Sequence, residues 1–232
     1  MNEQLNFFFS RIKSITYALF TEIKNSIGED WLRELIKKYG EELKIPWTIR
    51  RLALFDRIVK KAQDFKDRIN DAKEAFAAWL LFKREILDTY KITNEDLERA
   101  VSVLERLHRE QKYPRGLFIW NPTHGEYKRV SLLAQYGPQE DIEDIEKAFD
   151  IGYYLYPFMK DVSPLILLGL LLPALDPENK NVYLEEALIA LKMAKLADFW
   201  YSLIERREQP DFEHWKFWES FIKKWNERKK AR

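Results

Sequence analysis

The stretch from residue 92 to residue 133 constrains the fold most, because it is where the sequence leaves helical periodicity. Thr93 can act as an N-cap, and Asp96 three residues later allows the reciprocal hydrogen bonds of a capping box. Apolar residues then follow the i, i+3, i+4, i+7 spacing of one buried helix face, at Leu97, Ala100, Val101, Leu104 and Leu107.

The residues after this helix have the pattern of a β-hairpin. Residues 117–120 are an apolar run with a β-branched and two aromatic side chains, residues 121–125 have turn chemistry, and residues 127–132 alternate polar with apolar side chains. A lone hairpin is marginal in water, so this one is expected to pack on helices. The sequence predicts a mainly α protein, a multi-helix bundle-like fold with one small β-hairpin.

The order of helix and hairpin over residues 71–136 resembles the recognition helix and wing of a winged helix. The resemblance implies that the helix lies in a DNA major groove and carries Arg99 and Arg106. It also implies that Lys128 and Arg129 of the hairpin contact phosphate.

The alternative is a helix and a hairpin that merely pack together. The outer face of the helix favours this alternative, because Glu95, Glu98 and Glu105 lie among its arginines. A recognition helix usually needs net positive charge near phosphates.

Length and charge leave the domain number open. The 232 residues suit one large domain or two smaller ones, divided near Gly137 into residues 1–136 and 137–232. The 39 basic and 38 acidic side chains nearly cancel, for a formal charge of +1. No global field therefore steers the chain towards nucleic acid, and any such site must be a local patch.

Composition excludes several kinds of site. The chain has no cysteine, which excludes disulfides, thiolate nucleophiles and cysteine metal sites. Abundant Lys, Glu and Arg resemble a thermophile composition. The N-terminus lacks a basic signal-peptide region, and the apolar run at residues 165–175 is too short to span a membrane, so we expect no transmembrane segment and a cytoplasmic protein.

Helical periodicity covers much of the remaining chain. The first amphipathic helix is expected to end at Gly28, with at least one of the three phenylalanines at 7–9 exposed. The spacing of apolar residues over 47–90 predicts either one long helix or two helices with a break near Asn70 and Asp71. In the second case, Asp71 would cap the second helix. Pro157 is expected to end another helix.

A tryptophan-rich helix is expected to start near Pro210, followed by a basic tail that includes Lys223 and Lys224. The tryptophans of this helix form an apolar stripe. It can dock on the rest of the chain, on a second copy or on a protein partner. It can also lie on an anionic membrane, or bind a nucleic acid strand together with the lysines. We expect it to be buried, because exposed stripes of this size are rare in soluble monomers. The residues of the stripe are Trp215, Trp218, Ile222 and Trp225.

The three histidines offer few places for catalysis or metal binding. Glu105 and His108 form a Glu-x-x-His pair similar to those of ferritin-like di-iron bundles, and Asp211 with His214 repeats the spacing with the wrong acid. Such a centre also needs a glutamate from each of two other helices, and none stands on a predicted buried stripe, so we expect no metal and no cofactor. His124, at the hairpin tip, is expected to be a solvated turn residue.

Arg207 and His214 are separated by six residues. This spacing resembles the Arg-x(4–6)-His motif of the HEPN family of α-helical ribonucleases and toxins. The resemblance implies a metal-independent ribonuclease, usually dimeric, in which the histidine transfers a proton and the arginine holds the scissile phosphate. The match covers only residues 207–214.

The sequence favours a non-catalytic protein that binds DNA or RNA, or a regulatory module, over an enzyme. The candidate nucleic-acid contacts are the arginines of the helix, the two basic residues of the hairpin and the two lysines near the C-terminus. A HEPN-like ribonuclease and a helical protein–protein adaptor remain as alternatives.

Overall fold

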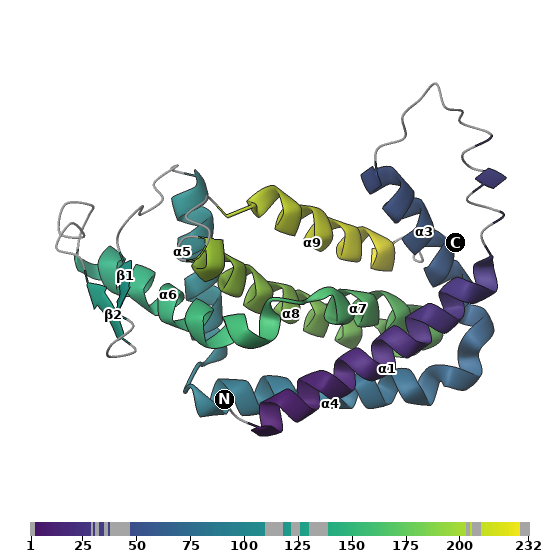
Figure 1. Cartoon of the computed structure of the whole chain (residues 1–232), viewed down its shortest axis with the longest axis horizontal. Helices are drawn as coiled ribbons and strands as arrows, with labels where there is room; N and C mark the ends of the chain where they lie inside the picture. Colours follow the sequence, from purple (N-terminus) through teal and green to yellow (C-terminus); the bar gives the residue numbers. More distant parts are fainter. Residues whose placement is uncertain are drawn as a thin grey trace. The chain divides into compact units, whose positions relative to one another are not determined.

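The computed structural model describes residues 3–28, 30, 33, 34, 37, 47–109, 118–121, 126–129, 139–202, 205 and 210–227. At residues 47–50, 118–121, 126–129, 139–142, 225 and 226 it describes the backbone alone. The mainly helical class is confirmed (Figure 1). The chain divides into two compact units that alternate along the sequence: Met1–Phe82, Ser163–Ala187 and Ile222–Arg232 form the first, and Lys83–Val162 and Leu188–Phe221 form the second.

In the first unit, α1 (Glu3–Ile27) lies antiparallel to the early part of α4 (Ile69–Thr89). Phe9 packs on Phe82 with ring centroids 5.3 Å apart, and Glu22 near the other end of α1 pairs with Arg68 at 3.1 Å. Phe7 is 63% exposed, as expected for one of the three phenylalanines. The buried face of α1 repeats every three or four residues, at Leu5, Phe9, Ile12, Thr16, Leu19 and Ile23.

The long helical pattern is two helices joined by a break. α3 (Trp47–Ala62) continues through the 3-10 helix η1 (Gln63–Arg68) into α4, and the backbone leaves helical geometry at Phe65 (φ −105°, ψ 36°). The break thus comes earlier than expected. Asp71 lies inside α4, where it pairs with Arg68 at 2.9 Å, so its predicted role as the cap was wrong.

α7 (Ser163–Leu175) is buried all round, as its uniformly apolar sequence predicts. It packs on α1 and α3. Gly169 allows a close approach to α8 (Lys180–Tyr201), because a Cβ at this position would lie 2.7 Å from the Cβ of Ala187. Among the described residues, no single helix is long and apolar enough to cross a membrane, although Glu143–Met159 and α7 taken together pass that test of length and composition.

A buried carboxylate fastens the link between α7 and α8. Asp176, which precedes the 3-10 helix η3 (Pro177–Asn179), is 7% exposed. Its Oδ2 accepts hydrogen bonds from the hydroxyl of Tyr183 at 2.7 Å and the amide of Asn179 at 3.0 Å, and it pairs with Lys73 of α4 at 3.1 Å. These donors, the tyrosine first, lower the pKa of Asp176.

In the second unit, α5 (Asn94–Arg109) packs on α6 (Gln139–Met159). α6 continues through Pro157 to Met159, so the expected end at Pro157 was wrong by two residues. The last helix, α9 (Phe212–Glu227), begins two residues after Pro210, close to the predicted start.

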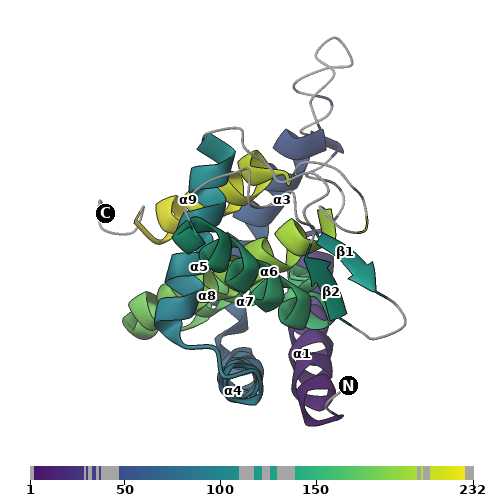
Figure 2. The same ribbon diagram turned by 90° about the vertical axis from the view of Figure 1, so that its left-hand side faces the viewer.

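Two short antiparallel strands, β1 (Phe118–Asn121) and β2 (Glu126–Arg129), also belong to the second unit (Figure 2). Their register pairs Phe118 with Arg129 and Asn121 with Glu126. The connecting turn with His124, and the expected domain boundary near residue 137, lie outside the described residues.

Candidate nucleic-acid interface

The start of α5 has the predicted capping box. The backbone N–H of Asp96 donates to Oγ1 of Thr93 at 3.1 Å, and the N–H of Thr93 donates to Oδ2 of Asp96 at 2.9 Å. Asp96 also pairs with Lys147 of α6 at 2.5 Å, and this contact is the main cause of its lowered pKa. The confirmed cap fixes where α5 begins and therefore which residues it presents to its neighbours.

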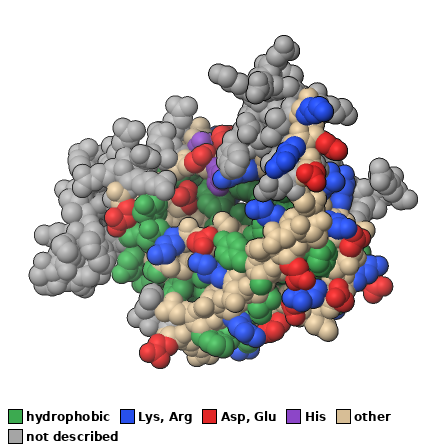
Figure 3. Space-filling view, turned by 45° about the vertical axis from the view of Figure 1, so that its right-hand side comes forward, with side chains coloured by type: hydrophobic (Ala, Val, Ile, Leu, Met, Phe, Trp, Pro, Cys, Tyr) green, Lys and Arg blue, Asp and Glu red, His purple; other side chains and the backbone are tan. Residues whose placement is uncertain are grey.

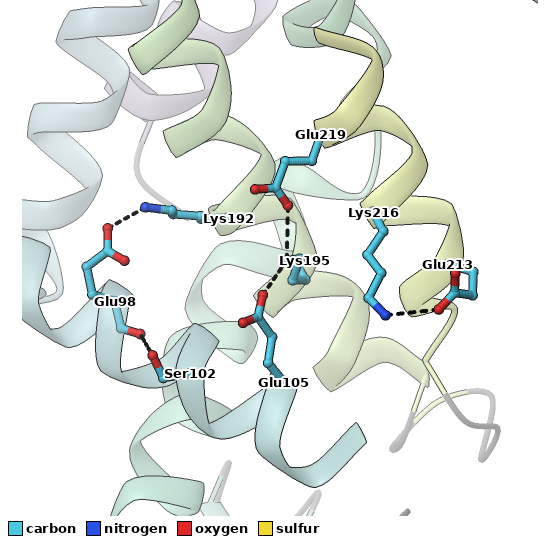
Figure 4. A network of polar contacts seen from close by, with 8 residues as sticks. All are labelled: Glu98, Ser102, Glu105, Lys192, Lys195, Glu213, Lys216 and Glu219. Atoms are coloured by element: carbon cyan, nitrogen blue, oxygen red, sulfur yellow. Dashed lines mark hydrogen bonds and ion pairs between the residues drawn. The ribbon is translucent and has the colours of Figure 1, made fainter. Parts of the chain in front are cut away.

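The polar side of α5 is occupied by ion pairs with other helices (Figure 4). Arg99 lies 3.7 Å from Asp144 of α6, and Glu98 pairs with Lys192 of α8. Of the two arginines assigned to a recognition helix, Arg99 therefore has a carboxylate partner within the unit, and Arg106 is half-buried. A groove-binding helix would have to present these arginines to phosphate or base edges instead.

The strands place Lys128 and Arg129 opposite Ile119 and Phe118. The side chains of both basic residues lie outside the described part of the structure. The winged-helix assignment stays a prediction for this reason.

The buried face of α9 is aromatic. Phe212 is 2% exposed and Ile222 is fully buried, while the indole N–H of Trp215 donates to Oδ2 of Asp198 on α8 at 3.0 Å. The predicted burial of Trp215 and Ile222 is confirmed. Trp218 is only half-buried, and the side chain of Trp225 lies outside the described residues.

A second aromatic stripe runs beside the buried one. His214, Phe217, Trp218 and Phe221 have the i, i+3, i+4, i+7 spacing of one helix face, and we call them the α9 ring stripe. Ring centroids lie 6.3 Å apart between His214 and Trp218, 5.4 Å between Phe217 and Trp218, and 5.9 Å between Trp218 and Phe221. The histidine is exposed and the other three rings are half-buried, so the stripe keeps part of each ring in solvent.

The solvent side of α9 carries three lysines, of which only Lys224 lies beside these rings, because the helical repeat places Lys216 and Lys223 on the opposite flank of the helix. Lys216, Lys223 and Lys224 are exposed, and Lys216 also contacts Glu213 at 3.0 Å. Elsewhere positive and negative side chains are interspersed, as one face of the molecule illustrates (Figure 3). The two lysines named from the sequence thus share a helix with half-exposed rings.

Charged and aromatic contacts hold the start of α9 on its neighbours. Lys195 of α8 is 6% exposed and lies between Glu105 of α5 at 3.2 Å and Glu219 of α9 at 3.8 Å (Figure 4). His108 of α5 stacks on Phe212 with ring centroids 4.5 Å apart. The sequence did not reveal these contacts, because periodicity shows which face is buried and not which helix it meets.

The two acid–histidine pairs found in the sequence, Glu105 with His108 and Asp211 with His214, have structural roles. Glu105 and His108 contact other helices rather than a common point, and Oδ1 of Asp211 accepts the backbone N–H of His214 at 3.0 Å, which caps α9. Arg207 lies outside the described residues. Within the described part of the chain, no group of three acidic or histidine side chains could hold a metal ion.

A hollow of about 600 Å³ lies in the first unit, between the end of α1 and α3. Its lining includes Lys60 and Lys61, which pair with Asp56 at 2.8 Å and Asp64 at 2.5 Å. Because carboxylates already neutralise these cations, the hollow is a weaker anion site than its lysines suggest.

Comparison with known proteins does not place the chain in a family. No family model matches it, and neither a curated protein nor a solved structure shows significant similarity to it.

Proposed function

We propose that this protein binds single-stranded nucleic acid through α9. The observation that carries the proposal is the α9 ring stripe, in which half-exposed rings at helical spacing run beside the exposed Lys224. Bases stack on aromatic side chains with about 1–3 kcal/mol each, and basic side chains follow the phosphates.

A single strand fits this surface better than a duplex. Stacking on a protein ring needs a base that is not enclosed between two others, and a single strand supplies such bases. The net charge of +1 adds no long-range attraction, so the electrostatic part of binding must come from local basic side chains such as Lys224.

The hairpin has a secondary role in this proposal. Lys128 and Arg129 would extend the phosphate contacts as a wing does, while α5 serves as a packing helix. Replacing both residues with Ala should then weaken binding only modestly and reduce its salt dependence. A loss as large as that caused by changes in α9 would instead favour the winged-helix interpretation with the hairpin at the centre.

The test measures fluorescence anisotropy of labelled oligothymidine and oligouridine at two salt concentrations. Trp218→Ala should weaken binding by about tenfold, because it removes a stacking platform. Lys224→Gln should lower the slope of log affinity against log salt by about 0.7, the contribution of one phosphate contact on a single strand.

Phe7→Ala is the matched control, because it removes an exposed ring from a different helix, α1. It should leave affinity unchanged. Absence of binding at low salt, or equal losses from Phe7→Ala and Trp218→Ala, would contradict the proposal. Cleavage of oligouridine in EDTA that disappears in His214→Ala would identify the HEPN-like ribonuclease instead.

A further inference from the structure

A continuous path of aromatic rings crosses the second unit and is made of residues outside the α9 ring stripe. Tyr90, the residue after α4, stacks on Tyr154 of α6 with centroids 4.5 Å apart and planes 13° apart. Tyr154 contacts Tyr153 at 5.5 Å, and Tyr153 contacts Trp200 of α8 at 5.5 Å. The tyrosines are half-buried and Trp200 is 6% exposed, so the tyrosine rings lie at the surface over a buried indole.

The path continues on the other side of the indole. Tyr156 lies 5.0 Å from Trp200 and stacks on Tyr201 with centroids 4.8 Å apart and planes 9° apart. Gly152 makes this arrangement possible, because a Cβ there would lie 2.4 Å from the backbone oxygen of Leu196. The absence of a side chain brings α6 onto α8, and the tyrosines that follow Gly152 then meet Trp200.

Carboxylates precede these rings on α6. Glu146, Asp150, Tyr153 and Tyr154 stand at i, i+4, i+7 and i+8, which places them along one side of the helix. We call these four residues and Tyr90 the acidic tyrosine face. Partial loss of water around the carboxyl and then the charge of Glu146 raise the pKa of Asp150. A cation brought by a ligand would favour the ionised form of Asp150.

The chemistry of this face selects the ligand. Flat, partly exposed tyrosine rings suit the rings of proline, and a polyproline II helix makes no internal backbone hydrogen bonds, so its carbonyl oxygens can accept from tyrosine hydroxyls. Such a peptide is already extended and loses little conformational freedom on binding. The neighbouring carboxylates repel phosphate and attract arginine or lysine, which argues against nucleic acid here.

We propose that the acidic tyrosine face docks a proline-rich segment of a partner protein, in polyproline II conformation, with a basic residue beside Asp150 and Glu146. The site is separate from α9 and does not depend on the function proposed there. The rings supply the binding area, and the carboxylates fix the direction of the peptide.

The experiment titrates the full chain into a fluorescein-labelled decaproline that carries two arginines at one end. Saturable binding is expected, and Tyr154→Ala should weaken it by tenfold or more. Asp150→Asn should weaken it several-fold while leaving the affinity for decaproline without arginines unchanged. Tyr17→Ala is the control variant, because Tyr17 is a surface tyrosine of α1 in the other unit and should have no effect.

Two comparisons make the result decisive. A glycine–serine peptide with the same two arginines should bind far more weakly, and equal binding would show attraction of charge alone and overturn the proposal. Absence of saturable binding, or equal affinities of wild type and Asp150→Asn for the arginine peptide, would also overturn it. Asn at this surface position keeps the size of the side chain. The comparison of wild type with Asp150→Asn therefore tests the proposal even if Tyr154→Ala does not fold.

Discussion

The indole N–H of Trp79 donates a 2.9 Å hydrogen bond to Oε2 of Glu186. The bond joins α4 to α8 across 107 positions of sequence, and the indole itself is 2% exposed. One turn before Trp79, the ring of Phe76 meets Tyr183 edge-on, with centroids 4.9 Å apart. The same two helices thus meet through a buried ring, a polar bond and an aromatic pair.

Trp79→Phe should lower the free energy of unfolding by about 2 kcal/mol or more, because it leaves a smaller ring in the core and removes the donor facing Glu186. Chemical denaturation followed by circular dichroism measures the change. Glu186→Gln keeps an acceptor of the same size and should cost clearly less. Equal losses from the two variants would mean that the carboxylate charge, rather than the indole, matters at this contact.

Asp176→Asn should destabilise the protein at neutral pH by about 1.5–3 kcal/mol, the usual range for a hydrogen bond to a charged group. Because the folded-state pKa of Asp176 lies below its unfolded value, its stabilisation is present above about pH 3.9 and is lost as pH falls through the folded pKa. Melting curves at several pH values should therefore show wild type and variant converging in acid. A difference that stayed constant down to the lowest pH would assign the loss to packing.

Asp150→Asn should raise the melting temperature at neutral pH, since the raised folded-state pKa of Asp150 means that its ionisation opposes folding. This opposition is absent below the unfolded pKa of about 3.9 and develops as pH rises through the folded value. The gain should accordingly vanish in acid. Glu143→Gln, at an exposed acid on the same helix, is the comparison, and an equal gain there would point to general charge repulsion.

Gly152→Ala and Gly169→Ala should both destabilise the fold, but a second substitution should restore stability only to Gly169→Ala. The new methyl at 152 meets the backbone oxygen of Leu196 at 2.4 Å, whereas the one at 169 meets the Cβ of Ala187 at 2.7 Å. Overpacking typically costs about 1–3 kcal/mol. Adding Ala187→Gly to Gly169→Ala frees the space and should recover part of the loss, as thermal melting would show. Failure of that rescue would contradict the close approach of α7 to α8.

Local chemistry made several features predictable from the sequence. The capping exchange of Thr93 with Asp96, the end of α1 at Gly28 and the burial of Trp215 all follow from spacing and residue type within one segment. The break at Phe65 was misplaced because the residues before it carry no proline or glycine to mark it.

Contacts between distant segments could not be read from the sequence. Hydrophobic periodicity identified the inner face of α5, yet it gave no means of pairing Glu98 with Lys192 or of placing Tyr90 on Tyr154. The α9 ring stripe was missed for a related reason. Phe217 and Phe221 were visible beside the tryptophans, but only the structure separates the buried face from the half-exposed one.

Because Lys195 is buried under α9, the chemical reactivity of its amine reports whether α9 is packed against α5 and α8. Amine acylation requires an accessible nitrogen, and this one lies among Glu105 and Glu219 at 6% exposure, while lysines such as Lys60 and Lys216 face solvent. Brief treatment with an acylating reagent followed by mass spectrometry should leave Lys195 among the last lysines to react. Any condition that separates α9 from α5 and α8 would expose that nitrogen. The acylation rate of Lys195 would therefore measure how often α9 opens locally.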